Sequence, residues 1–170
     1  VTDEREDLTI LYLAQTPVSR LRIVVETWLA AFAATLMLVA VPTVLAVMLA
    51  GRAEVSMAGK ADLVLAVVLS TAAYTALAVA LGFFTRRAML FGLAYVLLWE
   101  SIVASFASSA GNFSVSSHAR VVLARSLDVL TRYEVKPPDT GVVTSLVVLV
   151  AIVAVALALA GRRLQRMNLP

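Results

Sequence analysis

Four apolar runs divide the chain and constrain its fold more than any other feature. They extend from Leu29 to Leu49, from Leu63 to Phe84, from Ala88 to Phe106 and from Val142 to Ala160. Each run is close to the ~20 residues that an α-helix needs to cross a bilayer. Hydrophobic residues make up 61% of the sequence and charged residues 15%, which leaves more apolar surface than one soluble core could hide. The sequence therefore predicts an all-α integral membrane protein with four transmembrane helices.

The length and composition also limit the chemistry that the chain can carry. A chain of 170 residues that spends about half its length in lipid has no room for a separate catalytic domain. It has no cysteine and one histidine, His118, so neither a thiolate metal site nor a histidine cluster can form. We expect no metal, no cofactor and no enzymatic activity in this chain. The net charge of +3 does not indicate nucleic-acid binding, because the basic residues sit at helix ends.

Arginines mark the ends of the runs that we expect to face the cytoplasm. They precede the first run, separate the second from the third, and follow the fourth: Arg20, Arg22, Arg86, Arg87, Arg162, Arg163 and Arg166. Short loops rich in Lys and Arg stay inside, whereas the basic residues of the other loops are interleaved with acidic ones. We therefore place both ends of this chain in the cytoplasm and the protein in the plasma (inner) membrane.

The predicted organisation is a single transmembrane domain over residues 1–170. A cytoplasmic helix at 3–15 precedes spans at 17–50, 63–84, 88–106 and 141–161, and an outer segment occupies 107–140. Pro42 should bend the first span. Small residues at helical spacing should let another helix pack closely on the second: Ala66, Ser70, Ala73, Ala76 and Ala80. The last span lacks a charge or an aromatic residue within its apolar run, so we expect it to face lipid.

The segment from Asp3 to Ala14 is the first functional candidate. Asp3 and Glu6 have the spacing of a capping box, and the leucines that follow give the helix an apolar side. Such a helix can lie on lipid, but an anionic leaflet would repel its acidic first turn. A protein partner is the interpretation that we prefer.

Glu100, beside Trp99 near the outer end of the third span, is the second candidate. An ionisable group in a span is costly unless it faces protein or water, and such a group is a functional candidate by default. The structural alternative is that Glu100 caps a helix end or reaches the headgroups. Tyr74 in the second span either lines a path or hydrogen-bonds a neighbouring helix.

The outer segment is the third candidate. A helix that starts at Ser116 or Ser117 would have charged residues on one side and leucines on the other, so we expect an amphipathic helix on the outer face. His118 falls toward its polar side, which favours a solvated or capping histidine over a metal ligand or proton relay.

The order of these segments resembles that of type-2 permease subunits of ATP-binding cassette (ABC) exporters. The first match is the acidic, leucine-rich stretch that ends in a PVSR break, EREDLTILYLAQTPVSR from Glu4 to Arg20. The paired arginines before the third run, the YVLLWE stretch from Tyr95 to Glu100, the SVSSHAR stretch and the GRRLQR tail match in the same order. Together these matches cover most of the chain.

The resemblance implies a six-span half-transporter whose fifth span is followed by outer re-entrant or amphipathic helices. This chain would hold spans three to six and a helix that docks on a separate ABC ATPase subunit. Spans one and two and the start of the coupling helix are not in the sequence, so upstream segments are expected to be missing from it. ATP and Mg would bind the ATPase, and a second permease copy, identical or related, would complete the path through the lipid bilayer. The residues implied for ATPase coupling are Thr9, Leu11, Leu13, Pro17 and Arg20. Those implied for the outer gate or substrate path are Tyr74, Tyr95, Trp99 and Glu100.

Two other functions fit the residues. A secondary carrier would use Glu100 as its proton or cation site and would transport without ATP. A membrane anchor or assembly subunit would need only the spans and a docking helix. A break followed by an outer helix is more than a plain anchor requires. The mostly apolar spans favour hydrophobic or amphipathic cargo.

Overall fold

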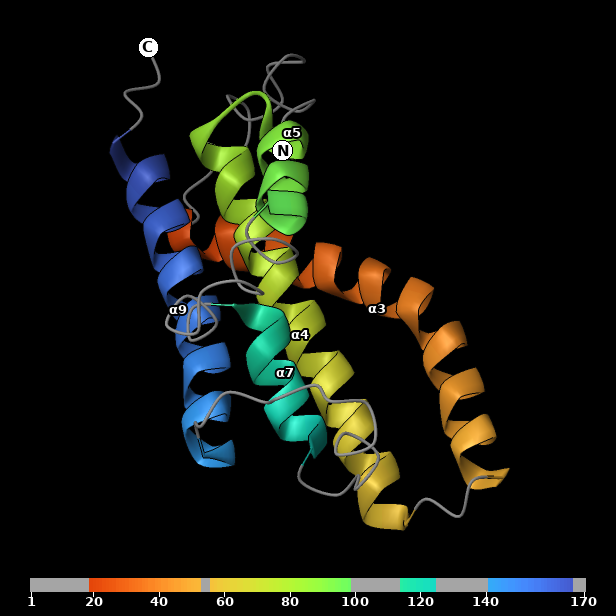
Figure 1. Cartoon of the computed structure of the whole chain (residues 1–170). Coiled ribbons are helices and arrows are strands. Elements are labelled where there is room, and N and C mark those ends of the chain that lie inside the picture. Colours follow the sequence, from red (N-terminus) through yellow and green to blue (C-terminus); the bar gives the residue numbers. More distant parts are fainter. Residues whose placement is uncertain (1–18, 53–55, 99–113, 125–140, 167–170) are drawn as a thin grey trace.

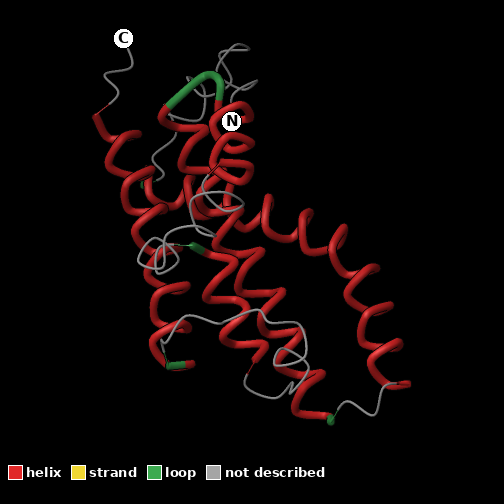
Figure 2. The backbone as a smooth tube through the Cα atoms, in the orientation of Figure 1, coloured by secondary structure: helices red, strands yellow, loops and turns green. Residues whose placement is uncertain are grey.

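A computed structural model describes residues 19–52, 56–98, 114–124 and 141–166 (Figure 1). Its helices, in chain order, are α3 (Arg20–Arg52), α4 (Met57–Phe84), α5 (Ala88–Ala94), α7 (Val115–Ala124) and α9 (Val142–Arg166). No strand occurs within the described ranges (Figure 2). The all-α prediction is confirmed.

Three of these helices are long and apolar enough to cross a membrane: α3 over Arg20–Leu49, α4 and α9. The third predicted span, 88–106, is described only as far as Leu98, where α5 and a wider helical turn at 95–98 give a shorter apolar helix, Ala88–Leu98. The chain is therefore an all-α membrane protein, and a fourth span stays a prediction. The predicted cytoplasmic helix at 3–15 lies outside the described residues.

Local hydrogen bonds set the bounds of α4. Ser56 caps its first turn, because the Ser56 hydroxyl oxygen accepts a hydrogen bond from the Gly59 N–H at 3.1 Å. Thr85 ends the helix in an extended conformation while its N–H still donates to the Leu81 carbonyl. The two arginines that follow form a turn that leads directly into α5. α4 and α5 are thus a helical hairpin.

α4 is the centre of the bundle and packs against each of the other four helices. Its buried residues Ala73, Ala76 and Ala80 belong to apolar clusters that also hold Leu149 and Ala156 of α9. The predicted role in helix packing is therefore confirmed for these three small residues, whereas Ala66 and Ser70 line a cavity. The prediction that the last span simply faces lipid is wrong, because one side of α9 is buried against α4.

α3 joins the bundle through its first turns and then leaves it. Val24 is fully buried, whereas the large apolar side chains from Met37 to Leu49 are mostly exposed. Figure 1 shows α3 curving away from α4. Pro42 lies inside this helix, which continues past it to Arg52. The second half of α3 consequently has much exposed apolar surface, while Val39, Pro42 and Thr43 line a cavity with α4 and α7.

α7 corrects the prediction for the outer segment. Figure 1 shows it beside α4 and facing α9, and both packings are extensive. Val115 lies in one cluster with Ala73 at the middle of α4, while Leu123 shares a cavity with Leu63 near the start of α4. α7 therefore runs antiparallel to α4 and returns into the bundle, instead of lying on its outer face.

The prediction that His118 is solvated is also wrong, since its side chain is 1% exposed. The buried face of α7 is formed by Val115, His118, Val121 and Val122. His118 recurs with these valines at helical spacing, so it lies on the buried face of α7.

Candidate functional site

A pair of cavities along one face of α4 forms a candidate site. The α4–α7 cavity has a volume of about 480 Å³ and is walled by α3, α4 and α7. The α4–α5 cavity has a volume of about 690 Å³ and lies between the two helices of the hairpin. Both volumes are in the range of about 300–1,000 Å³ that is typical of small-molecule sites.

A single stripe of α4 forms the floor of both cavities. Its members recur every three or four residues, which places them on one helix face: Leu63, Ala66, Val67, Ser70, Tyr74, Leu77, Ala78 and Leu81. At 1.5 Å per residue the stripe from Leu63 to Leu81 is about 27 Å long. That length is close to the ~30 Å thickness of the hydrocarbon core. We call this continuous surface the α4 furrow.

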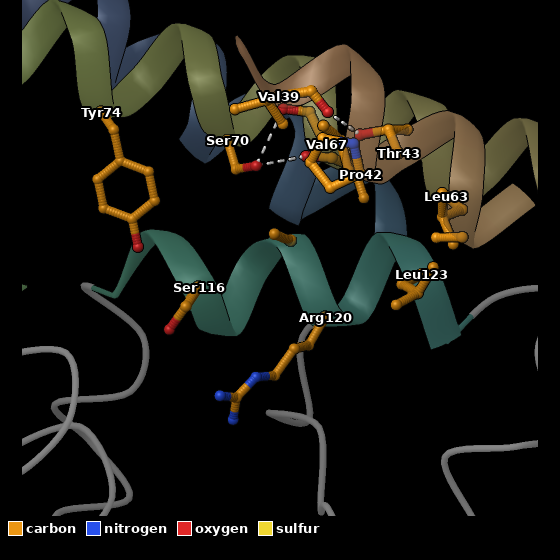
Figure 3. Close-up of a pocket in the computed structure, with 13 residues that line it drawn as sticks. Val39, Pro42, Thr43, Leu63, Val67, Ser70, Tyr74, Ser116, Arg120 and Leu123 are labelled. Carbon is orange, nitrogen blue, oxygen red and sulfur yellow. Dashed lines mark hydrogen bonds between the residues drawn. The ribbon is translucent and has the colours of Figure 1, made fainter. Parts of the chain in front are cut away.

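Tyr74 occupies the middle of the furrow and lines both cavities. In Figure 3 its ring extends from α4 toward the start of α7, on the same side as Ser116. Tyr95, on the turn that follows α5, lines the α4–α5 cavity opposite α4. The structure thus brings together two of the residues that the sequence assigned to a substrate path. The other two, Trp99 and Glu100, lie outside the described residues.

The walls of the α4–α7 cavity are apolar in effect, although they contain hydroxyl groups. The Ser70 hydroxyl donates to the carbonyl of Ala66 at 2.7 Å, and the Thr43 hydroxyl donates to that of Val39 at 2.7 Å (Figure 3). These hydroxyls are satisfied by their own helices. Arg120 of α7 is the charged residue of this lining, and Figure 3 shows its guanidinium pointing away from α3 and α4.

A buried polar pair holds α7 in place beside the furrow. The His118 Nδ1 and the Ser145 hydroxyl oxygen are 3.1 Å apart, and Ser145 is fully buried on α9. Ser114 caps the start of α7 by accepting a hydrogen bond from the Ser117 N–H at 3.2 Å. Within the described part of the chain, every buried side-chain nitrogen or oxygen has a hydrogen-bond partner. Sequence reasoning missed this pair, although the valine spacing around His118 was a signal for it.

Arginines gather at one end of the bundle, which we call the arginine end. Arg20 donates from a guanidinium nitrogen to the carbonyls of Leu164 and Gln165, at 2.7 and 3.0 Å. The Arg163 guanidinium carbon lies 5.9 Å from the centre of the Phe84 ring, within the range of a cation–π contact. These contacts join the start of α3, the end of α4 and the end of α9.

Of the coupling residues predicted from the sequence, the structure describes Arg20, which donates to the last carbonyls of α9. The remaining four, Thr9, Leu11, Leu13 and Pro17, lie outside the described residues.

Comparison of the chain with protein-family models, curated proteins and solved structures finds no match. The site must therefore be interpreted from its own geometry. Among the described residues no group of three or more His, Cys, Asp or Glu side chains could hold a metal ion. What remains is a long apolar furrow with a tyrosine in its middle and cations at one end. Such a surface suits an apolar or amphipathic ligand.

Proposed function

We propose that this chain is the membrane-spanning permease subunit of an ATP-driven exporter of the type-2 ABC class. The observation that carries the proposal is the return of α7 into the bundle, where the bond between His118 and Ser145 fixes it against α9. A plain anchor needs spans but no helix that re-enters them. A subunit that forms a path through the membrane needs a space between its helices, and α7 walls such a space together with α3 and α4.

In this proposal the four apolar runs are spans three to six of a six-helix half-transporter in the plasma (inner) membrane, with both ends of the chain in the cytoplasm. The substrate path follows the α4 furrow, and Tyr74 and Tyr95 line the same cavity along it. Trp99 and Glu100, which come four and five residues after Tyr95 in the sequence, are the other two residues that we assign to the path. A second permease copy, identical or related, closes it.

The arginine end supplies a mechanical route for coupling. ATP and Mg bind the separate ATPase subunit, whose closure displaces the helix around Leu8 to Leu13. That helix directly precedes α3, and Arg20 bonds the start of α3 to the end of α9. A displacement before α3 would therefore move α9 as well, and α9 packs against α4 and α7. Rigid-body tilting of these helices changes the width of the furrow.

The test is affinity purification of the tagged full-length protein from gently solubilised membranes, followed by mass spectrometry and an ATPase assay. The test variant is Leu11→Asp/Leu13→Asp. Its matched control is Thr2→Asp/Gln15→Asp, which adds the same charge to the same segment outside the leucines. We expect an ABC ATPase to copurify with the wild type and the control and to be lost from the test variant.

Purification without an ATPase would refute the permease proposal. Transport that follows an ion gradient and disappears in Glu100→Gln would then establish the carrier. If no transport is found at all, the membrane anchor or assembly subunit is the function that remains.

A further inference from the structure

We propose that the α4–α5 cavity binds an anionic phospholipid of the surrounding bilayer. Its headgroup would lie at the turn formed by Arg86 and Arg87, with one acyl chain extended along the furrow to Tyr74. The binding rests on the geometry of the hairpin alone. The interpretation of this lipid as cargo, or as a model of amphipathic cargo, rests on the proposed function.

The shape of the cavity matches an acyl chain. Its lining is aliphatic or aromatic and comes from both helices of the hairpin: Tyr74, Leu77, Ala78, Leu81, Phe91, Gly92, Tyr95 and Val96. Gly92 leaves one wall open, because a Cβ atom placed there would meet no other atom within 4 Å. An apolar hollow of this kind does not hold water, so in a bilayer it is filled by an apolar chain.

The length of the cavity matches one leaflet. Tyr74 and Thr85 at the turn are eleven positions apart, which corresponds to about 16 Å of helix. One leaflet contributes about 15 Å, half of the ~30 Å hydrocarbon core. A lipid whose phosphate lies beside the turn therefore has its acyl chain end near Tyr74, at the point where the furrow passes on to the α4–α7 cavity.

The charge of the hairpin selects the headgroup. Arg86 and Arg87 are both exposed, and residues 63–98 include no acidic residue. The N–H of Phe91, a lining residue, donates to the Arg87 carbonyl at 3.2 Å, so the mouth of the cavity is one helical turn from the arginines. Basic pockets between transmembrane helices bind the headgroups of anionic lipids. The arginines of the turn can thus bind an anionic headgroup, and the adjacent cavity can hold its apolar chain.

A third cavity lacks the paired arginines of the α4–α5 turn and serves as a comparison. It has a volume of about 730 Å³ between the end of α3 and the start of α4, and its lining includes Lys60. Asp62 lies two residues further along the same helix, so the net charge of that helix start is zero. An apolar hollow therefore occurs at both ends of α4, but the α4–α5 turn carries two arginines with no acidic residue between positions 63 and 98.

The first experiment is native mass spectrometry of the full chain, purified in mild detergent and titrated with phosphatidylglycerol or with phosphatidylcholine of identical acyl chains. We expect one phosphatidylglycerol to bind in preference to phosphatidylcholine. Since a Lys or Arg near the membrane surface is worth about 1 kcal/mol toward an anionic lipid, Arg86→Gln/Arg87→Gln should weaken this binding by about 30-fold. The matched control, Arg162→Gln/Arg166→Gln, removes the same charge from the exposed end of α9 and should leave the affinity within about threefold of the wild type.

The second experiment fills the furrow. Gly92→Leu places a side chain in the open wall and should abolish the preferred phosphatidylglycerol site. Ala158→Leu, on an exposed face of α9, adds comparable bulk elsewhere and should not. Size-exclusion profiles and helix content check that each variant is folded. If Gly92→Leu does not fold, Ala78→Leu fills the same cavity from α4.

Equal binding of the two lipids, or an arginine variant with wild-type affinity, would mean ordinary annular lipid and would overturn the proposal. Binding that survives both cavity-filling variants would place the lipid outside the furrow and would overturn it as well. The lipid titration needs no ATPase. Failure of the lipid site with an ATPase still copurifying, or the reverse, therefore separates this inference from the proposed function.

Discussion

The bond between His118 and Ser145 should be measurable as a coupling energy between α7 and α9. The perturbation is a double-mutant cycle of Ser145→Ala, His118→Ala and the combined variant. Both side chains are buried, at 1% and 0% exposure, and the two bonding atoms are 3.1 Å apart. Their positions are 27 residues apart in the chain, so a coupling between them reports tertiary packing and not local helix stability.

The expected coupling energy depends on whether the unfolded chain is in water or in the membrane. Depriving a buried polar group of its partner costs about 1–3 kcal/mol in a soluble protein. In membrane proteins interhelical hydrogen bonds average about 0.6 kcal/mol and reach about 1.7 kcal/mol, because the unfolded chain in the membrane also finds partners. Full burial should place this pair above that average and below that maximum, so we expect a coupling of about 1 kcal/mol. His118→Ala should cost about 2–3 kcal/mol in total, since it also leaves a cavity.

The assay is reversible unfolding of the full chain in mixed micelles with increasing dodecyl sulfate, followed by circular dichroism. Thr144→Ala is the matched control, because it removes a hydroxyl from the exposed neighbour of Ser145; its effect should stay within about 0.5 kcal/mol. A coupling energy indistinguishable from zero, with both single variants folded, would refute the bond between His118 and Ser145. It would also remove the contact that the proposed function uses to fix α7 against α9.

Three further predictions test the packing and the orientation. A Cβ atom at Gly161 would lie 3.1 Å from the Leu21 Cδ1, so Gly161→Leu should destabilise the contact of α3 with α9 by about 1–3 kcal/mol in the same unfolding assay, and an unchanged midpoint would contradict this close approach. Arg20→Gln should lower the free energy of unfolding by about 1 kcal/mol, because its hydrogen bonds to the α9 carbonyls are lost. If Arg20→Ala costs no more stability than the same substitution of a distant surface arginine, the cap is not formed. Because the chain has no cysteine, Ala58→Cys and Gln165→Cys can each be tested for labelling by an impermeant maleimide in intact cells. We expect only Ala58→Cys to react. Reaction of both variants would reject the assignment of the arginine end to the cytoplasm.

Some features follow from the sequence because they depend on the segment alone. A run of apolar residues needs no partner to become helical in lipid, since the helix satisfies its own backbone. The lengths of α3, α4 and α9 are thus predictable from composition and run length. The small-residue stripe of α4 is predictable for a similar reason, because close packing in a membrane requires small side chains whatever the neighbour is.

The errors share one physical cause. In a soluble helix an apolar residue indicates the buried side, but in a membrane both the lipid-facing and the protein-facing sides are apolar. The sequence of α9 consequently gave no sign that Leu149 and Ala156 face α4 while Val147 and Val155 are exposed. Sequence reasoning described the whole helix as lipid-facing for that reason.

The residues of the candidate site were also predictable singly, but not in their tertiary contacts. Tyr74 and Tyr95 were predictable as polar groups in apolar spans, but no spacing rule places them in one cavity, because they belong to different helices of a hairpin. His118 was misassigned because the fate of an imidazole depends on a hydroxyl 27 residues away.

The sequence by itself determined that this chain is helical, embedded in a membrane and basic at alternate helix ends, because these properties reside in single segments and in their contact with lipid and water. The tertiary structure alone decided that α7 enters the bundle, that Arg20 caps α9 and that one face of α4 becomes a furrow. Each of these depends on which surfaces of different helices meet, and an apolar surface in lipid does not specify its partner.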